Sequence, residues 1–171
     1  MLEGRSSSLS DRPSLLRHGL DGFAWRLLQP EGFAPVDFSR PFGEEALARA
    51  DSISWQVFKN PVALFVGGVA AVILELAEPR VGTAIWQHST FRTDPLKRLQ
   101  RTGLAAMMTI YGARGAAQVM IARVVRIHEK INGVTPSGQE YRAGDPELLG
   151  WVHATATLGF SEAYNCYARS L

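Results

Sequence analysis

Two histidines lie where an imidazole could bind a metal ion or a haem iron. His128 and His153 each fall on the apolar side of a predicted helix, and the two helices follow one another in the chain. The neighbours of His153 on its own helix face are small, namely Gly150 at i−3, Ala156 at i+3 and Thr157 at i+4. A flat ligand such as a haem could therefore approach this ring, because imidazole is a suitable iron ligand.

A structural role is the alternative for the same residues. His153 could be a buried core histidine with a hydrogen-bonded neighbour, and its small neighbours could serve only close helix packing. His88 is expected at a helix end as a cap or surface residue, and His18 on the surface of the first helix. Glu75 and Glu78 could be buried acids with a raised pKa, but an exposed helix terminus is the expectation.

The middle of the chain is basic. Residues 80–130 contain nine Lys and Arg against Asp94 and Glu129, a net charge of +7, so the remaining residues sum to −5. Arg123 and Arg126 could bind haem propionates through charge-assisted hydrogen bonds, or could simply be exposed. No nucleic-acid-binding motif accompanies these charges, so no nucleic-acid partner is expected.

Several other kinds of site are not supported by the motifs. There is no HExxH or ExxH pair for zinc or di-iron, no phosphate-binding G-x-x-x-x-G-K loop, and no nucleophilic serine between glycines. Residues 95–128 contain no carboxylate, so the sequence places no catalytic base there.

Apolar periodicity predicts an all-α domain of about six to seven helices. Residues 1–12 are polar and expected to be mobile, and residues 13–171 form the single domain. Residues 29–42 form a proline-containing loop, and residues 135–144 a polar loop or tiny hairpin. A buried stripe is expected along the helix that contains His128 (Ala117, Ile121, Val124, His128 and Ile131), and this helix is expected to pack antiparallel to the helix of His153. The predicted helices cover residues 13–28, 44–59 (with a break near residues 51–52), 61–76, 81–87, 96–111, 113–131 and 146–167.

The predicted location is the cytoplasm. Cys166 is the single cysteine, which fits a reducing compartment, and the N-terminus shows no apolar signal segment. The longest uncharged run, residues 60–74, is shorter than the roughly 20 residues that span a bilayer, so it is expected to be a buried helix. Interfacial insertion at a membrane surface is a minor alternative.

Three ordered motifs resemble a known family. They read ILELAEPRVGTAIWQHSTFRTDPLKRL, ARVVRIHEKINGV and YRAGDPELLGWVHAT. Across residues 61–167 the chain resembles the catalytic domain of latex-clearing protein (rubber oxygenase), which is shared with fungal MpaB-type oxygenases. The resemblance implies a globin-like helical domain that binds haem b, with His153 as the axial iron ligand and with Arg123 and His128 lining the haem pocket. It also implies O₂-dependent cleavage of carbon–carbon double bonds in an apolar, isoprenoid-like substrate.

The chain departs from this family pattern in three places. Relatives carry His-Pro where this chain has Glu78-Pro79, and the glutamate base of the rubber-cleaving enzymes has no counterpart that the sequence can place. Relatives also continue with further helices, so the domain is expected to be short at its C-terminus and a homo-oligomer could complete the pocket. The alternative hypothesis is a non-catalytic helical binding or oligomerisation module without haem.

Overall fold

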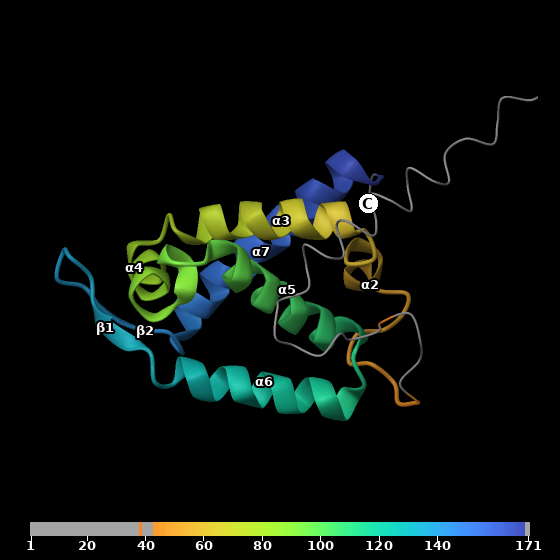
Figure 1. Cartoon of the computed structure of the whole chain (residues 1–171), viewed down its shortest axis with the longest axis horizontal. Coiled ribbons are helices and arrows are strands. Elements are labelled where there is room, and N and C mark those ends of the chain that lie inside the picture. Colours follow the sequence, from red (N-terminus) through yellow and green to blue (C-terminus); the bar gives the residue numbers. More distant parts are fainter. Residues whose placement is uncertain (1–37, 39–42, 170–171) are drawn as a thin grey trace, which may run out of the picture.

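The computed structural model describes Phe38 and residues 43–169. In this part of the chain the fold is mostly helical, as predicted, with six α-helices, one 3₁₀ helix and a two-stranded antiparallel hairpin. Figure 1 shows α3 and α7 along one side of the molecule, α6 along the opposite side, and α5 between them. The elements are α2 (Ile53–Val57), α3 (Pro61–Glu75), α4 (Pro79–His88), η1 (Thr90–Arg92), α5 (Pro95–Tyr111), α6 (Arg114–His128), β1 (Asn132–Val134), β2 (Glu140–Arg142) and α7 (Pro146–Tyr167).

Four of the helices begin with a polar cap that is followed directly by proline. The cap's side-chain oxygen accepts a hydrogen bond from a backbone N–H of the first turn, and the proline needs no such bond at that position. Asp94, for example, accepts from the Lys97 N–H at 3.0 Å, and Asp145 accepts from the Glu147 N–H at 2.9 Å. The four starts are Asn60-Pro61, Glu78-Pro79, Asp94-Pro95 and Asp145-Pro146.

The close packing of α3 on α7 forms the centre of the fold, and the lack of side chains at Gly67 and Gly159 makes it possible. A Cβ on Gly159 would lie 2.8 Å from the Gly67 carbonyl oxygen and 2.9 Å from the Ala71 nitrogen, and one on Gly67 would lie 2.8 Å from the Phe160 Cα. The pairing of Gly67 with Phe160 and of Ala71 with Gly159 shows that the two helices run antiparallel. The two glycines therefore allow the backbones of α3 and α7 to cross at close range.

Two apolar clusters stabilise the domain. The larger joins α2, α3, α5 and α7, and the Tyr111 hydroxyl adds a hydrogen bond of 2.7 Å to the Trp55 carbonyl. The smaller places α4 against the hairpin and the start of α7, where Arg80 bridges Glu78 at 2.7 Å and Glu147 at 2.9 Å. The buried members of the first cluster are Val57, Phe58, Ala63, Leu64, Met107, Ile110, Ala163 and Tyr164, and those of the second are Val81, Ile85, Tyr141 and Leu148.

Several predicted elements differ from those in the structure. The helix predicted over residues 44–59 is wrong before residue 53, where the chain forms turns and an isolated bridge, but its predicted break near residues 51–52 is confirmed because Ser52 caps the start of α2. The helix that contains His128 ends at that residue, three positions earlier than predicted, before β1 begins. The tiny hairpin is confirmed, with Gly133 opposite Tyr141. The mobile segment 1–12, the helix over 13–28, His18 and nearly all of the loop over 29–42 lie outside the described residues.

No single helix of the described part is long and apolar enough to cross a membrane. The pair α3 and α4 satisfies the same test of length and composition when taken together, but the two helices are bent by 112° at their junction.

Candidate functional site

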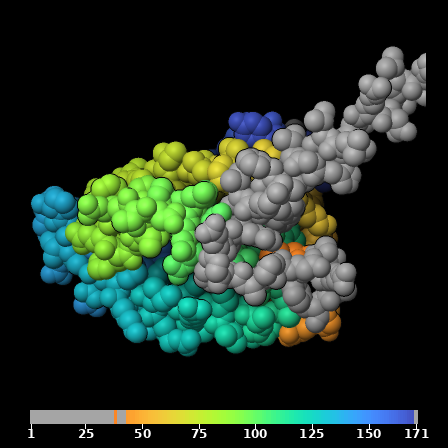
Figure 2. Space-filling view, in the orientation of Figure 1, coloured from red at the N-terminus to blue at the C-terminus, as the bar shows by residue number. Residues whose placement is uncertain are grey.

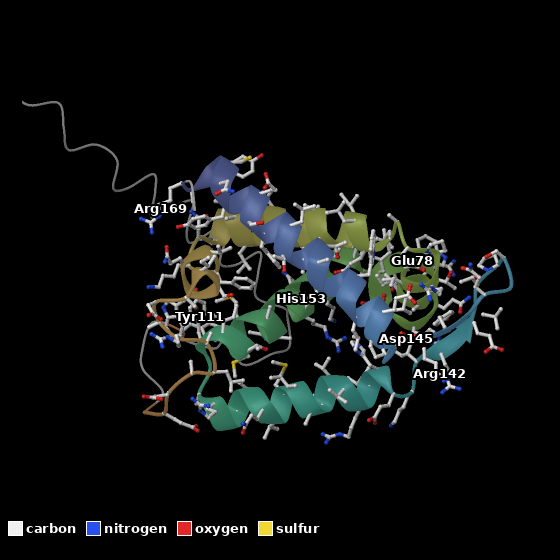
Figure 3. The ribbon with its side chains drawn as sticks, turned by 180° about the vertical axis from the view of Figure 1, so that it is seen from behind. Glu78, Tyr111, Arg142, Asp145, His153 and Arg169 are labelled. Carbon is white, nitrogen blue, oxygen red and sulfur yellow. The ribbon has the colours of Figure 1, made fainter. Side chains whose placement is uncertain are left out.

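His153 is an exposed residue near the middle of α7, so the interpretation of it as a buried core histidine is wrong. The opposite side of α7 is buried against α3 through Thr155, Gly159 and Ala163, which fixes the rotation of the helix. Gly150, one turn before His153, has open space where its side chain would be. Figure 3 shows His153 along the middle of α7, away from Glu78, Arg142 and Asp145 at the hairpin end. The imidazole is therefore accessible to a ligand.

His128 is the last residue of α6 and is half-buried. Burial lowers its pKa from the ordinary 6.5. The ring is consequently neutral at pH 7, and a neutral imidazole is the form that binds a metal. His128 is thus in the neutral form that an imidazole ligand of a metal has, and it lies at the C-terminal end of α6.

The buried stripe predicted for α6 is mostly wrong. Of its members only Ala117 is fully buried, while Val124, His128 and Ile131 are half-buried and Ile121 is 37% exposed. Helix α6 packs on α5, and α7 packs on α3, so α6 and α7 do not form the antiparallel pair that the sequence predicted. The partial exposure of the stripe follows, because no described helix covers that side of α6.

Apolar side chains accompany both histidines on these uncovered faces. Ile121 and Val125 lie seven and three residues before His128, so they share its face, and Val125 is 49% exposed. Leu149 lies four residues before His153 and is 41% exposed. An apolar ring system with a metal at its centre suits such surroundings, since it could contact aliphatic side chains while an imidazole reaches the metal.

The structure does not bring Arg123 and Arg126 to the side of His128. Both arginines are exposed on α6. At 3.6 residues per turn, each lies roughly 150° around the helix from His128. Arg123 and Arg126 would need a ligand that reaches around α6 in order to bind propionates together with His128. The haem-binding role that the sequence suggested for them therefore stays a prediction.

Glu75 is a buried acid, which is the alternative that the sequence allowed but did not favour. Its expected exposure at the end of α3 is wrong, because it is 9% exposed and lies 3.8 Å from the guanidinium of Arg98 on α5. Burial raises the pKa of Glu75 despite the opposing attraction of Arg98, and burial also lowers the pKa of Arg98. Glu75 and Arg98 are thus a carboxyl group and a guanidinium whose pKa values are both shifted by burial inside the domain. Shifted pKa values are a common feature of functional sites. Glu78, by contrast, caps α4 and pairs with Arg80, which lowers the pKa of Glu78.

The register of α3 and α7 places Glu75 in the half of the domain that contains His153. Ala71 lies beside Gly159, and the helices run antiparallel. Glu75 is one turn beyond Ala71, so it lies beside the turn of α7 that precedes Gly159 and includes Thr155. His153 belongs to that same N-terminal half of α7. A buried acid and an exposed imidazole are therefore presented by the same end of the α3–α7 pair.

In the described part of the chain, no three His, Cys, Asp or Glu side chains gather so that they could hold an ion. His88, the remaining described histidine, is exposed, and its Nε2 is 3.1 Å from the Tyr141 hydroxyl, which donates to the Gln87 side chain at 2.9 Å. A porphyrin supplies most of the ligands of its iron, so one histidine is sufficient for it.

Comparison with known proteins gives one match. Residues 55–171 match the family model described as the catalytic domain of ER-bound oxygenase mpaB/B′ and rubber oxygenase. No curated protein and no solved structure matches the chain. The globin-like part of the expected fold therefore stays a prediction.

Proposed function

Because this chain belongs to the mpaB/rubber oxygenase catalytic-domain family, we propose that it is a haem b-dependent oxygenase that acts with O₂ on an apolar, isoprenoid-like substrate. The observation that carries the haem proposal is the accessible imidazole of His153, with open space beside Gly150 and exposed aliphatic side chains nearby. The residues fit a haem in part: imidazoles and apolar side chains are present, while Arg123 and Arg126 lie on another face of α6.

His153 is the proposed axial ligand, and His128 is its competitor. His153 is the more exposed of the two and is held on a helix whose packing against α3 fixes its position. His128 has its neutral form favoured by burial, which suits a pocket residue that donates or accepts a hydrogen bond. When bound, the haem supplies the iron that activates O₂.

Glu75 is the proposed proton acceptor of the reaction. The pKa of a general base works best near the operating pH, and burial moves the pKa of Glu75 in that direction. Arg98 would hold the carboxylate in place and offset its charge when it is ionised.

An absorption spectrum tests the cofactor directly. The purified protein is measured before and after addition of hemin and after reduction with dithionite, and is then passed through a gel-filtration column. We expect a Soret band that survives the column in the wild type and is lost in His153→Ala, with unchanged far-UV circular dichroism. His88→Ala is the matched control, because His88 is also exposed but lies on α4.

The three histidine variants separate the outcomes. Loss of the band in His128→Ala but not in His153→Ala would transfer the axial role to His128. Absence of a band in the wild type at every hemin concentration would refute the haem proposal. Retention of the band in all three variants would show that the bound hemin does not use these histidines.

A non-catalytic binding or oligomerisation module is the second candidate. The observation that favours it is the exposed aliphatic surface of α6, where Val119 is 70% exposed and Ile127 is 46% exposed. Light scattering during gel filtration tests it, with an oligomer that dissociates in Val119→Glu and without hemin binding as the supporting result. Both candidates include the proposal that the protein works in the cytoplasm.

A further inference from the structure

A second surface of the molecule combines exposed apolar side chains with cations. It is formed by α4, η1 and the start of α5, and we call it the Trp86 patch (Trp86, Arg92, Leu96, Lys97 and Arg101). Trp86 is 51% exposed and Leu96 is 43% exposed, and the three basic residues are exposed as well. Figure 2 shows α4 and the residues that follow it, in yellow-green and green, as one continuous part of the surface.

A direct contact joins two members of this patch, Trp86 and Arg92. The guanidinium of Arg92 lies 5.3 Å from the centre of the Trp86 ring, which is a cation–π distance, and the rings of Trp86 and Phe91 are 6.1 Å apart. Lys97 and Arg101 are one helical turn apart on α5 and so project from the same face. The patch therefore combines the indole with the Arg92 cation, and the adjoining start of α5 adds two further cations and the exposed Leu96.

Nothing in this stretch of sequence balances those charges well. Between residues 79 and 128 the single acidic residue is Asp94, and its carboxylate already caps α5 by accepting from the Lys97 N–H. The attraction of the patch for an anionic surface is consequently only weakly opposed.

We propose that the Trp86 patch docks this protein on membrane surfaces that contain anionic phospholipids. Tryptophan concentrates at the boundary between headgroups and acyl chains, where its ring is apolar and its N–H remains near water. Lysine and arginine next to it would contact lipid phosphates. A nucleic acid would use the cations and the indole but not Leu96, so the lipid surface accounts for more of the patch.

The patch is also connected to the buried acid. The Arg98 guanidinium lies 5.9 Å from the centre of the Phe91 ring and 3.8 Å from the Glu75 carboxylate. Successive contacts thus lead from exposed Trp86 through Phe91 and Arg98 to Glu75. Docking would bring this part of the domain close to the lipid phase, where apolar, isoprenoid-like molecules accumulate.

Vesicle co-sedimentation tests the proposal on the full chain. Vesicles of phosphatidylcholine containing phosphatidylserine are compared with vesicles of phosphatidylcholine alone, at low and high salt. The test variant is Arg92→Gln/Lys97→Gln/Arg101→Gln. The matched control is Lys59→Gln/Lys130→Gln/Arg142→Gln, which removes the same charge from exposed positions outside the patch.

We expect salt-sensitive binding to the anionic vesicles and a partition coefficient lowered roughly 100-fold in the test variant, since each basic side chain near an anionic surface contributes about fivefold. The control variant should bind within about threefold of the wild type, because its charges lie outside the patch and are screened beyond a Debye length. Brominated lipids should quench the wild-type fluorescence more than that of Trp86→Phe.

Three results would overturn the proposal: equal binding to vesicles with and without phosphatidylserine, equal losses in the two triple variants, or binding to RNA or heparin without binding to vesicles. Vesicle binding needs no haem. Its outcome is therefore independent of the hemin titration, and either proposal can fail without the other.

Discussion

Replacement of Gly159 by alanine tests whether the α3–α7 crossing determines the stability of the domain. The new methyl group would lie 2.8 Å from the Gly67 oxygen and 2.9 Å from the Ala71 nitrogen, both backbone atoms that cannot rotate away. Ordinary contacts of this kind need about 3.5 Å, so the helices must separate by roughly 0.7 Å and lose part of their dispersion energy. Overpacking of this kind costs about 1–3 kcal/mol, which exceeds the gain in helix propensity of roughly 1 kcal/mol.

Gly150→Ala is the matched control, because it is the same substitution in the same helix at a site with nothing within 4 Å of the new Cβ. It should raise the free energy of unfolding by about 0.5–1 kcal/mol through helix propensity alone. Gly159→Ala should lower it by up to about 2 kcal/mol, a decrease in Tm of up to about 8 °C for a domain of this size. Urea unfolding followed by circular dichroism measures both. Equal effects of the two substitutions would refute the proposed close crossing.

Three further predictions concern charged groups. Burial raises the pKa of Glu75, so protonation of Glu75 stabilises the fold at acid pH. This contribution is lost as the pH rises above 4.5 through the folded-state pKa. Glu75→Gln should therefore flatten the pH dependence of the free energy of unfolding measured in urea. Arg98→Met should lower the free energy of unfolding by roughly 2–3 kcal/mol, because it leaves Glu75 unpaired. The double variant Glu75→Gln/Arg98→Met should lower it by less than Arg98→Met alone. Additive effects of the two substitutions would contradict a coupled pair. Because burial lowers the pKa of His128, stability should fall as pH drops below 6.5 towards the folded-state pKa, and His128→Gln should remove that loss in acid-titration experiments.

Local sequence signals predicted the helix starts. Each of the pairs Asn60-Pro61, Asp94-Pro95 and Asp145-Pro146 specifies a cap and a first-turn residue without help from the rest of the chain, and the structure has a helix at every one. Gly67 is also unfavourable in an apolar helix unless another backbone approaches it, and the backbone of α7 does so at Phe160. The helix starts depend on neighbours in sequence, which is why they could be predicted.

Burial of individual side chains could not be predicted in the same way. Glu75 has the sequence context of an exposed helix end, three residues before the next cap, and only the packing of α5 and α7 around α3 encloses it. Conversely, Ile121 belongs to the stripe that was predicted to be buried and yet is exposed, because no described helix lies over that side of α6. Periodicity identifies which residues share a face, whereas the tertiary arrangement decides what covers that face.

The helices of this domain differ in how closely they pack against their neighbours, and this difference affects the positions of His153, Glu75 and His128. Helix α7 packs closely against α3, so His153 on the exposed side of α7 and Glu75 beside its packed side keep a defined position relative to one another. Helix α6 contacts mainly α5, so the position of His128 relative to His153 depends on that one contact. A ligand that touched both His128 and His153 would connect α6 to α7, two helices that do not pack against each other. Because Ile121, Val125 and Leu149 are exposed on the uncovered faces of these two helices, an apolar group bound there would reduce the apolar surface in contact with water.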